Sequence, residues 1–95
     1  MAKAYWIVRV SVTKPEEYPA YLDAARPAFE KYGARFVVRG GMYQCMEGSS
    51  RERNVVVEFA DLATAHACYA SDEYQKAKAI RQRTADADFV IVEGA

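Results

Sequence analysis

The amino-acid sequence predicts an α+β fold in which four strands form one antiparallel sheet with helices on one face. Three observations carry this prediction. Segments rich in Val, Ile, Phe and Tyr recur four times and have the composition of strands. Two intervening segments repeat apolar residues at three and four positions, which is the spacing of a helix. The order strand, helix, strand, strand, helix, strand is the split βαβ plan of ferredoxin-like folds.

Size and charge limit the classes of protein to which the chain can belong. Its 95 residues, 52% of them hydrophobic, suffice for a single domain, residues 1–95, with one modest core. The 13 basic and 13 acidic side chains cancel, so the chain lacks the basic surplus with which proteins bind nucleic acid. We therefore expect no nucleic-acid partner.

The sequence also predicts a soluble, cytoplasmic protein without a membrane partner. Nothing at the N-terminus resembles a signal peptide, and no apolar run is long enough to cross a bilayer. Cys45 and Cys68 belong to no metal or redox spacing, so we interpret both as reduced, largely buried thiols.

The first strand, residues 5–12, alternates between an apolar face that carries Trp6, Val8 and Val10 and a mixed face that carries Ile7 and Arg9. Residues 13–16 have the pattern of a capping box, which predicts a helix start there.

The first helix has an apolar stripe formed by Tyr18, Leu22, Ala25, Phe29 and Tyr32. Gly33 predicts its end. Pro27 lies inside the pattern, so we expect the helix to bend near Asp23.

Residues 34–48 and 53–60 read as two long antiparallel strands joined by a polar turn. Strict alternation places Phe36 and Val38 on one face and Arg39 on the other. Gly40 and Gly41 predict a bulge or bend, after which pairing resumes through residues 42–46. In the third strand Glu58 lies on the face opposite the apolar Val55, Val57 and Phe59.

An interrupted helix pair and a last strand complete the chain. Asp61 is a suitable N-cap for a helix over residues 62–69, and Ser71 begins a second helix over residues 72–83. Tyr74, Ala77 and Arg81 align along the latter. A turn over residues 84–87 then precedes a strand over residues 89–93.

The sheet face away from the helices combines apolar and charged residues. It is expected to carry Tyr5, Ile7, Val37 and Val56 beside Arg9, Arg39 and Glu58. Such a face is too apolar for solvent, and a second copy of the same face is its simplest cover. We therefore predict a homodimer whose two sheets stack into a dimeric α+β barrel.

In combination, several segments resemble the domain-of-unknown-function family 1330. The resemblance covers nearly the whole chain and is carried by Tyr5-Trp6, residues 31–41, Glu47-Gly48, residues 55–59, residues 71–76 and residues 90–94. That family belongs to the dimeric α+β barrel superfamily, so the resemblance implies the same fold and dimer. It implies no catalytic residues, because none is established for the family. Related barrels include cofactor-free monooxygenases, haem-degrading enzymes, isomerases and plain binding proteins, so the shared fold does not select a reaction.

Arg9, Arg39 and Glu58 form the first candidate site. Two guanidinium groups can grip the oxygens of a small anionic or carbonyl ligand, and Glu58 can orient them or act as a base. The alternative is a structural ion-pair network that sets the register of the dimer.

Tyr18, Tyr69 and His66 are further candidates for ligand binding. The tyrosines can pack on the sheet while their hydroxyls face a cleft between sheet and helices. His66 is the single histidine and has no metal-ligand spacing around it, so we expect neither a metal site nor a bound cofactor.

Three hypotheses for function follow. The first is a small-molecule site in each half of the dimer, with or without cofactor-independent catalysis. The second is a binding or assembly module without chemistry. The third, RNA recognition on an open sheet, lacks the stacking aromatic residues and the basic face that it needs.

Overall fold

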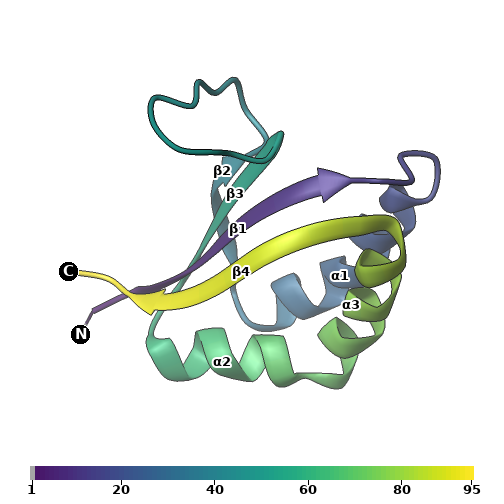
Figure 1. Ribbon diagram of the computed structural model, residues 1–95. Helices are drawn as coiled ribbons and strands as arrows, with labels where there is room; N and C mark the ends of the chain where they lie inside the picture. The colour runs from purple at the N-terminus through teal and green to yellow at the C-terminus, as the bar shows by residue number, and fades with distance from the viewer. Residues whose placement is uncertain (1) are drawn as a thin grey trace.

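The computed structural model describes residues 2–95 and contains one antiparallel sheet whose strands lie in the order β2-β3-β1-β4. The strands are β1 (Ala4–Val12), β2 (Arg35–Arg39), β3 (Arg53–Phe59) and β4 (Ala85–Glu93). The helices α1 (Tyr18–Lys31), α2 (Leu62–Ala70) and α3 (Asp72–Thr84) cover one face of the sheet (Figure 1). The predicted ferredoxin-like order is confirmed, with its second helix divided at Ser71 as expected.

Trp6 lies at the centre of the core between the sheet and the helices. It belongs to the buried face of β1, and its indole Nε1 donates a hydrogen bond of 3.0 Å to the carbonyl of Ala65 in α2. Its ring lies with centroid separations between 4.8 and 6.1 Å from the rings of Phe29, Phe59, Tyr69, Tyr74 and Phe89. Each such pair contributes about 0.5–1.5 kcal/mol beyond the burial of area, so this cluster fixes the helices on the sheet.

Helix α1 starts later than the capping box predicts. Its N-cap is Glu17, which makes no side-chain capping bond, and Pro19 occupies the first turn. The predicted box is wrong because the amides of Glu17 and Tyr18 instead bond the carbonyl of Lys14 and form a turn before the helix. The helix then continues through Pro27 to Lys31 without interruption.

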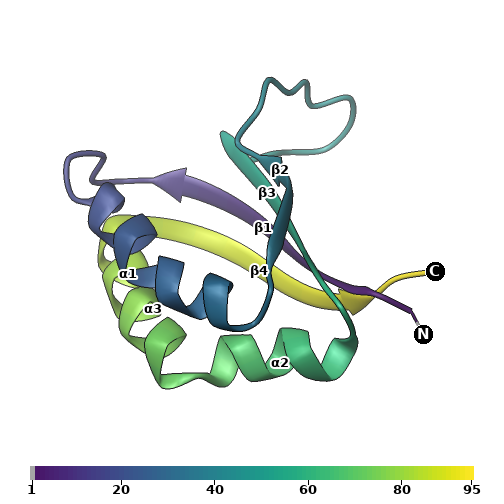
Figure 2. The ribbon, with the colours of Figure 1, turned by 180° about the vertical axis from the view of Figure 1, so that it is seen from behind.

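The buried face of α1 also differs from the predicted stripe. Tyr18, Tyr21, Ala25 and Ala28 are buried, whereas Leu22 is exposed. The small Ala25 and Ala28 allow α1 to lie beside α3 (Figure 2). The hydroxyls of Tyr21 and Tyr74 join the two helices at 2.9 Å. Because α1 packs against α3, its buried face includes Tyr21 in place of the predicted Leu22.

The β2–β3 hairpin contains a bulge where alternation was expected. Phe36 pairs with Val57 and Val38 with Val56, so Val37 is the extra residue. Gly40 then adopts a φ of 63° and its amide bonds the carbonyl of Asn54 at 2.8 Å. The prediction that pairing resumes through residues 42–46 is wrong, because residues 41–52 form a loop that extends beyond the end of the hairpin (Figure 1).

Helices α2 and α3 begin at the capping residues that the sequence predicts. The Asp61 carboxylate accepts from the amide of Thr64 at 2.7 Å, and the Ser71 hydroxyl accepts from the amide of Tyr74 at 3.1 Å. The predicted turn over residues 84–87 is wrong. There is no room for it, since β4 starts at Ala85 and pairs at once with the end of β1.

The predictions about the two thiols and about membrane-spanning helices can also be compared with the structure. Cys45 and Cys68 are both free thiols, but only Cys68 is buried, because Cys45 lies in the exposed loop. No helix in residues 2–95 has the length and apolarity needed to span a membrane.

Candidate functional site

The predicted cluster of Arg9, Arg39 and Glu58 is not formed. Arg9 and Glu58 lie on the sheet face away from the helices, as expected from the alternation of β1 and β3. Arg39 pairs with Val55, whose side chain belongs to the helix-facing side. The bulge at Val37 is the physical reason, because one extra residue reverses the facing of every residue after it.

Glu58 takes part in a network on the outer face of the sheet. Its carboxylate accepts hydrogen bonds of 3.2 Å from Lys3 Nζ and from the Tyr5 hydroxyl, and Arg35 Nη1 lies 3.7 Å away. The hydrogen bond from Lys3 is the largest cause that lowers the pKa of Glu58 below its ordinary value. Glu58 is thus an ionised member of an ion-pair network.

Arg9 lies apart from that network. Within residues 2–95 no carboxylate is within ion-pair distance of its guanidinium, and it borders a separate hollow under the loop over residues 41–52. Apolar side chains surround this part of the outer face. Ile7, Val38, Val90 and Val92 are between 40% and 54% exposed.

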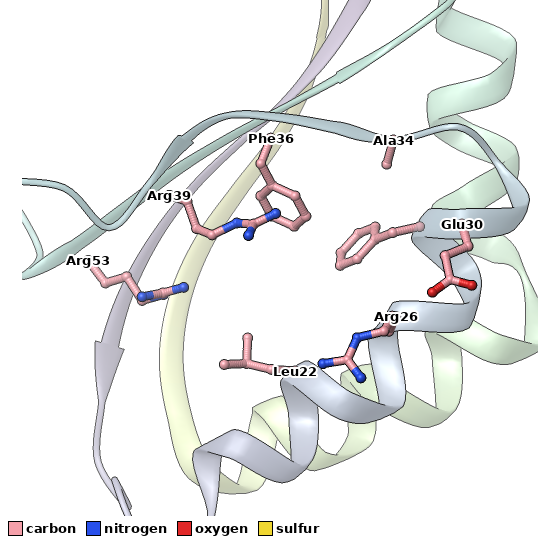
Figure 3. Close-up of a pocket in the computed structure, with 8 residues that line it drawn as sticks. Leu22, Arg26, Glu30, Ala34, Phe36, Arg39 and Arg53 are labelled. Atoms are coloured by element: carbon pink, nitrogen blue, oxygen red, sulfur yellow. The ribbon is translucent and has the colours of Figure 1, made fainter.

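A cleft opens on the other side of the sheet, between α1 and the β2–β3 edge. Its volume is about 370 Å³, and Figure 3 shows the guanidinium groups of Arg39 and Arg53 directed into it. Arg39 is held there by the ring of Phe36, whose centroid lies 3.8 Å from the guanidinium carbon. The residues that line the cleft are Leu22, Arg26, Phe29, Glu30, Ala34, Phe36, Arg39 and Arg53.

The cleft continues inward into a small compartment of about 30 Å³. Arg53 and three apolar residues of the cleft, Leu22, Phe29 and Phe36, border both spaces. The deeper lining consists of Trp6, Val8, Val10, Tyr18, Tyr21, Val55, Val57 and Arg81. The site as a whole has an apolar interior with guanidinium groups at its mouth and at its floor.

The arginines of the site are short of negative partners. Arg26 pairs with Asp23 at 3.3 Å on the exposed side of α1, and Glu30 is the one acidic residue in the lining. Among the described residues, no ion pair involves Arg39, Arg53 or Arg81. The buried Nε atoms of Arg53 and Arg81 have no hydrogen-bond partner.

The tyrosines of the site are neutral hydrogen-bonding groups. Burial raises the pKa of Tyr18, and the charges of Arg53 and Arg81 oppose this rise. Burial also raises the pKa values of Tyr21 and Tyr74. Tyr18 and Tyr21 can therefore donate hydrogen bonds to an oxyanion, and neither is prepared to act as a base at neutral pH.

The structure brings Arg39 and Tyr18 to the cleft and leaves the other predicted site residues elsewhere. Tyr69 packs in the core against Trp6 and Phe89, and His66 is exposed on α2. No three His, Cys, Asp or Glu side chains in residues 2–95 are grouped to hold a metal ion.

Arg53 and Arg81 were missed as site residues. Residues 53, 55 and 57 alternate along β3, so Arg53 lies on the same helix-facing side as Val55 and Val57. On α3, Arg81 continues the buried stripe of Tyr74 and Ala77. A charged residue on a core-facing stripe was the available signal in both cases.

Several solved structures share this fold. RPA0582 from Rhodopseudomonas palustris, a protein of unknown function, matches with a TM-score of 0.79 and 18% identity over 99% of this chain and 83% of that chain. SnoaB from Streptomyces nogalater, a cofactor-independent oxygenase, matches with a TM-score of 0.67 and 10% identity over 100% and 95% of the two chains. A dimeric protein of unknown function with a ferredoxin-like fold from Bacteroides fragilis matches with a TM-score of 0.58 and 16% identity over 96% and 95%.

These identities show a common fold and assign no activity. Among curated proteins, none matches the sequence. Residues 3–95 match the family described as Domain of unknown function (DUF1330).

Proposed function

Because the chain belongs to the DUF1330 family, whose description names no activity, we propose a function from the cleft itself: the protein binds a small organic anion between α1 and the β2–β3 edge. The single observation that carries this proposal is the pair of unpaired guanidinium groups, Arg39 and Arg53, that point into one cavity.

A carboxylate ligand would supply the ionic partner that the guanidinium groups of Arg39 and Arg53 lack within residues 2–95. The Nε of Arg53 is buried without a hydrogen-bond partner, and an unsatisfied buried polar group costs about 1–3 kcal/mol. A guanidinium binds a carboxylate through two parallel hydrogen bonds, each stronger than a bond between neutral groups. Arg39 is already oriented by its stacking on Phe36, so little side-chain entropy is lost when the anion binds.

The body of the ligand is expected to be apolar. Leu22, Phe29 and Phe36 form the walls of the cleft, and its volume of about 370 Å³ lies within the roughly 300–1,000 Å³ of small-molecule sites. Aromatic and branched aliphatic acids fit this combination of apolar walls and cationic mouth.

A reaction on the bound anion, without a cofactor, is a second candidate. Its support is that Tyr18 and Tyr21, whose hydroxyls are neutral, border the inner compartment, where a phenol can stabilise a developing oxyanion. SnoaB shares the fold and is an oxygenase that needs no cofactor, so the fold is compatible with such chemistry. Binding without turnover is the alternative, and product analysis with each bound acid separates the two.

The homodimer belongs to the same proposal. Ile7, Val38, Val90 and Val92 form an exposed apolar surface on the outer face of the sheet, which a second copy would cover. The neighbour from Bacteroides fragilis is dimeric, which supports this arrangement. The cleft opens on the opposite side of the sheet, so each protomer keeps its own site.

We also propose that the protein is located in the cytoplasm.

Thermal shift measurements with a panel of aromatic and aliphatic monocarboxylates test the binding proposal. A ligand at a hundredfold excess over its Kd stabilises the native state by about 2.7 kcal/mol, which raises the Tm of a domain of this size by roughly 10–20 °C. The shift should disappear in Arg53→Met and persist in Arg83→Met, a matched charge removal at an exposed position of α3. A shift of equal size in both variants, or no shift with any acid, would contradict the proposal.

A further inference from the structure

Arg81 is a buried charge at the floor of the cleft. Its side chain comes from the last turn of α3, the residue is only 6% exposed, and it borders the inner compartment. Arginine stays protonated at any pH at which a protein is folded, so this position holds a permanent positive charge in an apolar interior.

The surroundings of Arg81 supply rings but no anion. The guanidinium carbon lies 6.0 Å from the ring centroid of Tyr21 and 5.6 Å from that of Phe89. No carboxylate of residues 2–95 is within ion-pair distance, and the Nε has no hydrogen-bond partner. Most buried charges in proteins are paired, and Arg81 has no ionic partner among residues 2–95.

The mouth and the floor of the cleft are connected. Arg53 borders both the outer cavity and the inner compartment, and Tyr18 is within reach of the charges of both Arg53 and Arg81. A water occupies about 10–15 Å³ when cavity volume is measured in this way. The inner compartment, at about 30 Å³, therefore has the size of a small terminal group such as a carboxylate.

We propose that Arg81 receives a second carboxylate of the ligand, so that the natural ligand is a dicarboxylic acid with an apolar middle. One carboxylate lies at Arg39 and Arg53, the apolar middle lies against Phe29 and Phe36, and the other carboxylate enters the inner compartment at Arg81. Tyr18 and Tyr21 line that compartment. The Tyr18 hydroxyl can donate to the second carboxylate, and the Tyr21 hydroxyl can do so while it accepts from the Tyr74 hydroxyl. This inference rests on the proposed function and adds the class of ligand.

The binding of a second carboxylate at Arg81 is tested with pairs of acids that differ by one carboxylate. Isothermal titration calorimetry compares butyrate with glutarate, and phenylacetate with its para-carboxy derivative, on the wild-type protein. The monoamide of glutarate, in which an uncharged amide replaces one of the two carboxylates, serves as a size control. A charge-assisted pair in this setting should favour the diacid about 10- to 100-fold in Kd.

Variants assign that preference to a residue. Arg81→Met should abolish the preference for the diacid, and its Tm without ligand should be no lower than that of wild type. Arg53→Met should weaken both acids. Arg83→Met, exposed on the same helix, should change neither.

The outcomes separate this inference from the proposed function. Equal binding of monoacid and diacid by the wild-type protein, lost in Arg53→Met, would overturn the role of Arg81 and keep the anion site. Binding of neither acid would overturn both. If Arg81→Met does not fold, the comparison of monoacid and diacid on the wild-type protein still tests the inference, because that comparison needs no variant.

Discussion

The guanidinium of Arg39 lies 3.8 Å above the ring of Phe36, on the helix-facing side of β2. The two residues are three apart, an odd interval that regular alternation would place on opposite faces of the sheet. The bulge at Val37 brings them to the same face. This contact positions one of the two cations at the mouth of the cleft.

Phe36→Leu should therefore weaken anion binding while it preserves the apolar lining. A cation–π contact at a partly exposed site contributes about 0.5–1 kcal/mol, so the Kd for phenylacetate should rise about two- to fivefold. Calorimetric titration measures the change. Val38→Leu, on the other face of the sheet, is the control, and an unchanged Kd in Phe36→Leu would show that the stacking does not position Arg39.

The dimer should depend on the apolar surface of the outer face. Val90 pairs with Ile7 at the middle of that surface, and an aspartate there would have to be buried against the partner's apolar residues. Sedimentation velocity at micromolar concentration should show a dimer for wild type and a monomer for Val90→Asp. Ala79→Asp, at an exposed position of α3, should remain dimeric. A wild-type protein that sediments as a monomer would refute the homodimer.

The two thiols should react very differently. Burial raises the pKa of the Cys68 thiol to about 12, so almost none of it is thiolate at pH 7, whereas Cys45 is exposed in the loop. A chromogenic disulfide reagent should titrate one thiol in the native protein and two in denaturant. Cys45→Ser should remove the native reaction. Rapid reaction of both thiols in the native protein would contradict the packing of Cys68.

Glu58 should contribute a pH-dependent part of the stability. Its folded-state pKa is lowered, chiefly by the hydrogen bond from Lys3, so its stabilising effect is complete above the ordinary value near 4.5 and is lost as the pH falls through the lower folded value. Glu58→Gln should lower the Tm at pH 7, and the difference from wild type should shrink as the pH falls below about 4.5. Glu16→Gln, an exposed glutamate outside the ion pairs of residues 2–95, is the control. A difference that stays constant from pH 7 to pH 3 would argue against this network.

The element order could be predicted from the sequence because each element has its own local signal. Asp61 and Ser71 cap α2 and α3 as expected, Gly33 ends α1 with a φ of 65°, and Trp6 faces the core by simple alternation. These features depend on neighbouring residues alone.

The site was harder to predict because it depends on long-range pairing. Nothing in the run of residues 35–39 marks Val37 as a bulge, since bulges follow from how a strand meets its partner. The same limit explains the loop over residues 41–52, whose Met42 and Tyr43 have strand-like composition but no strand to pair with. Arg81 was recognised on its helix stripe, but the cleft beneath it appears only when α1 and the sheet are assembled.

An NMR titration that follows the Nε–H resonances of the arginine side chains tests the anion site most directly. With phenylacetate, the signals of Arg39 and Arg53 should shift together and saturate with a single Kd, while those of Arg9 on the outer face and Arg83 on α3 stay in place. Shifts confined to Arg9, or uniform shifts of all arginines that do not saturate, would contradict an anion site between α1 and the β2–β3 edge.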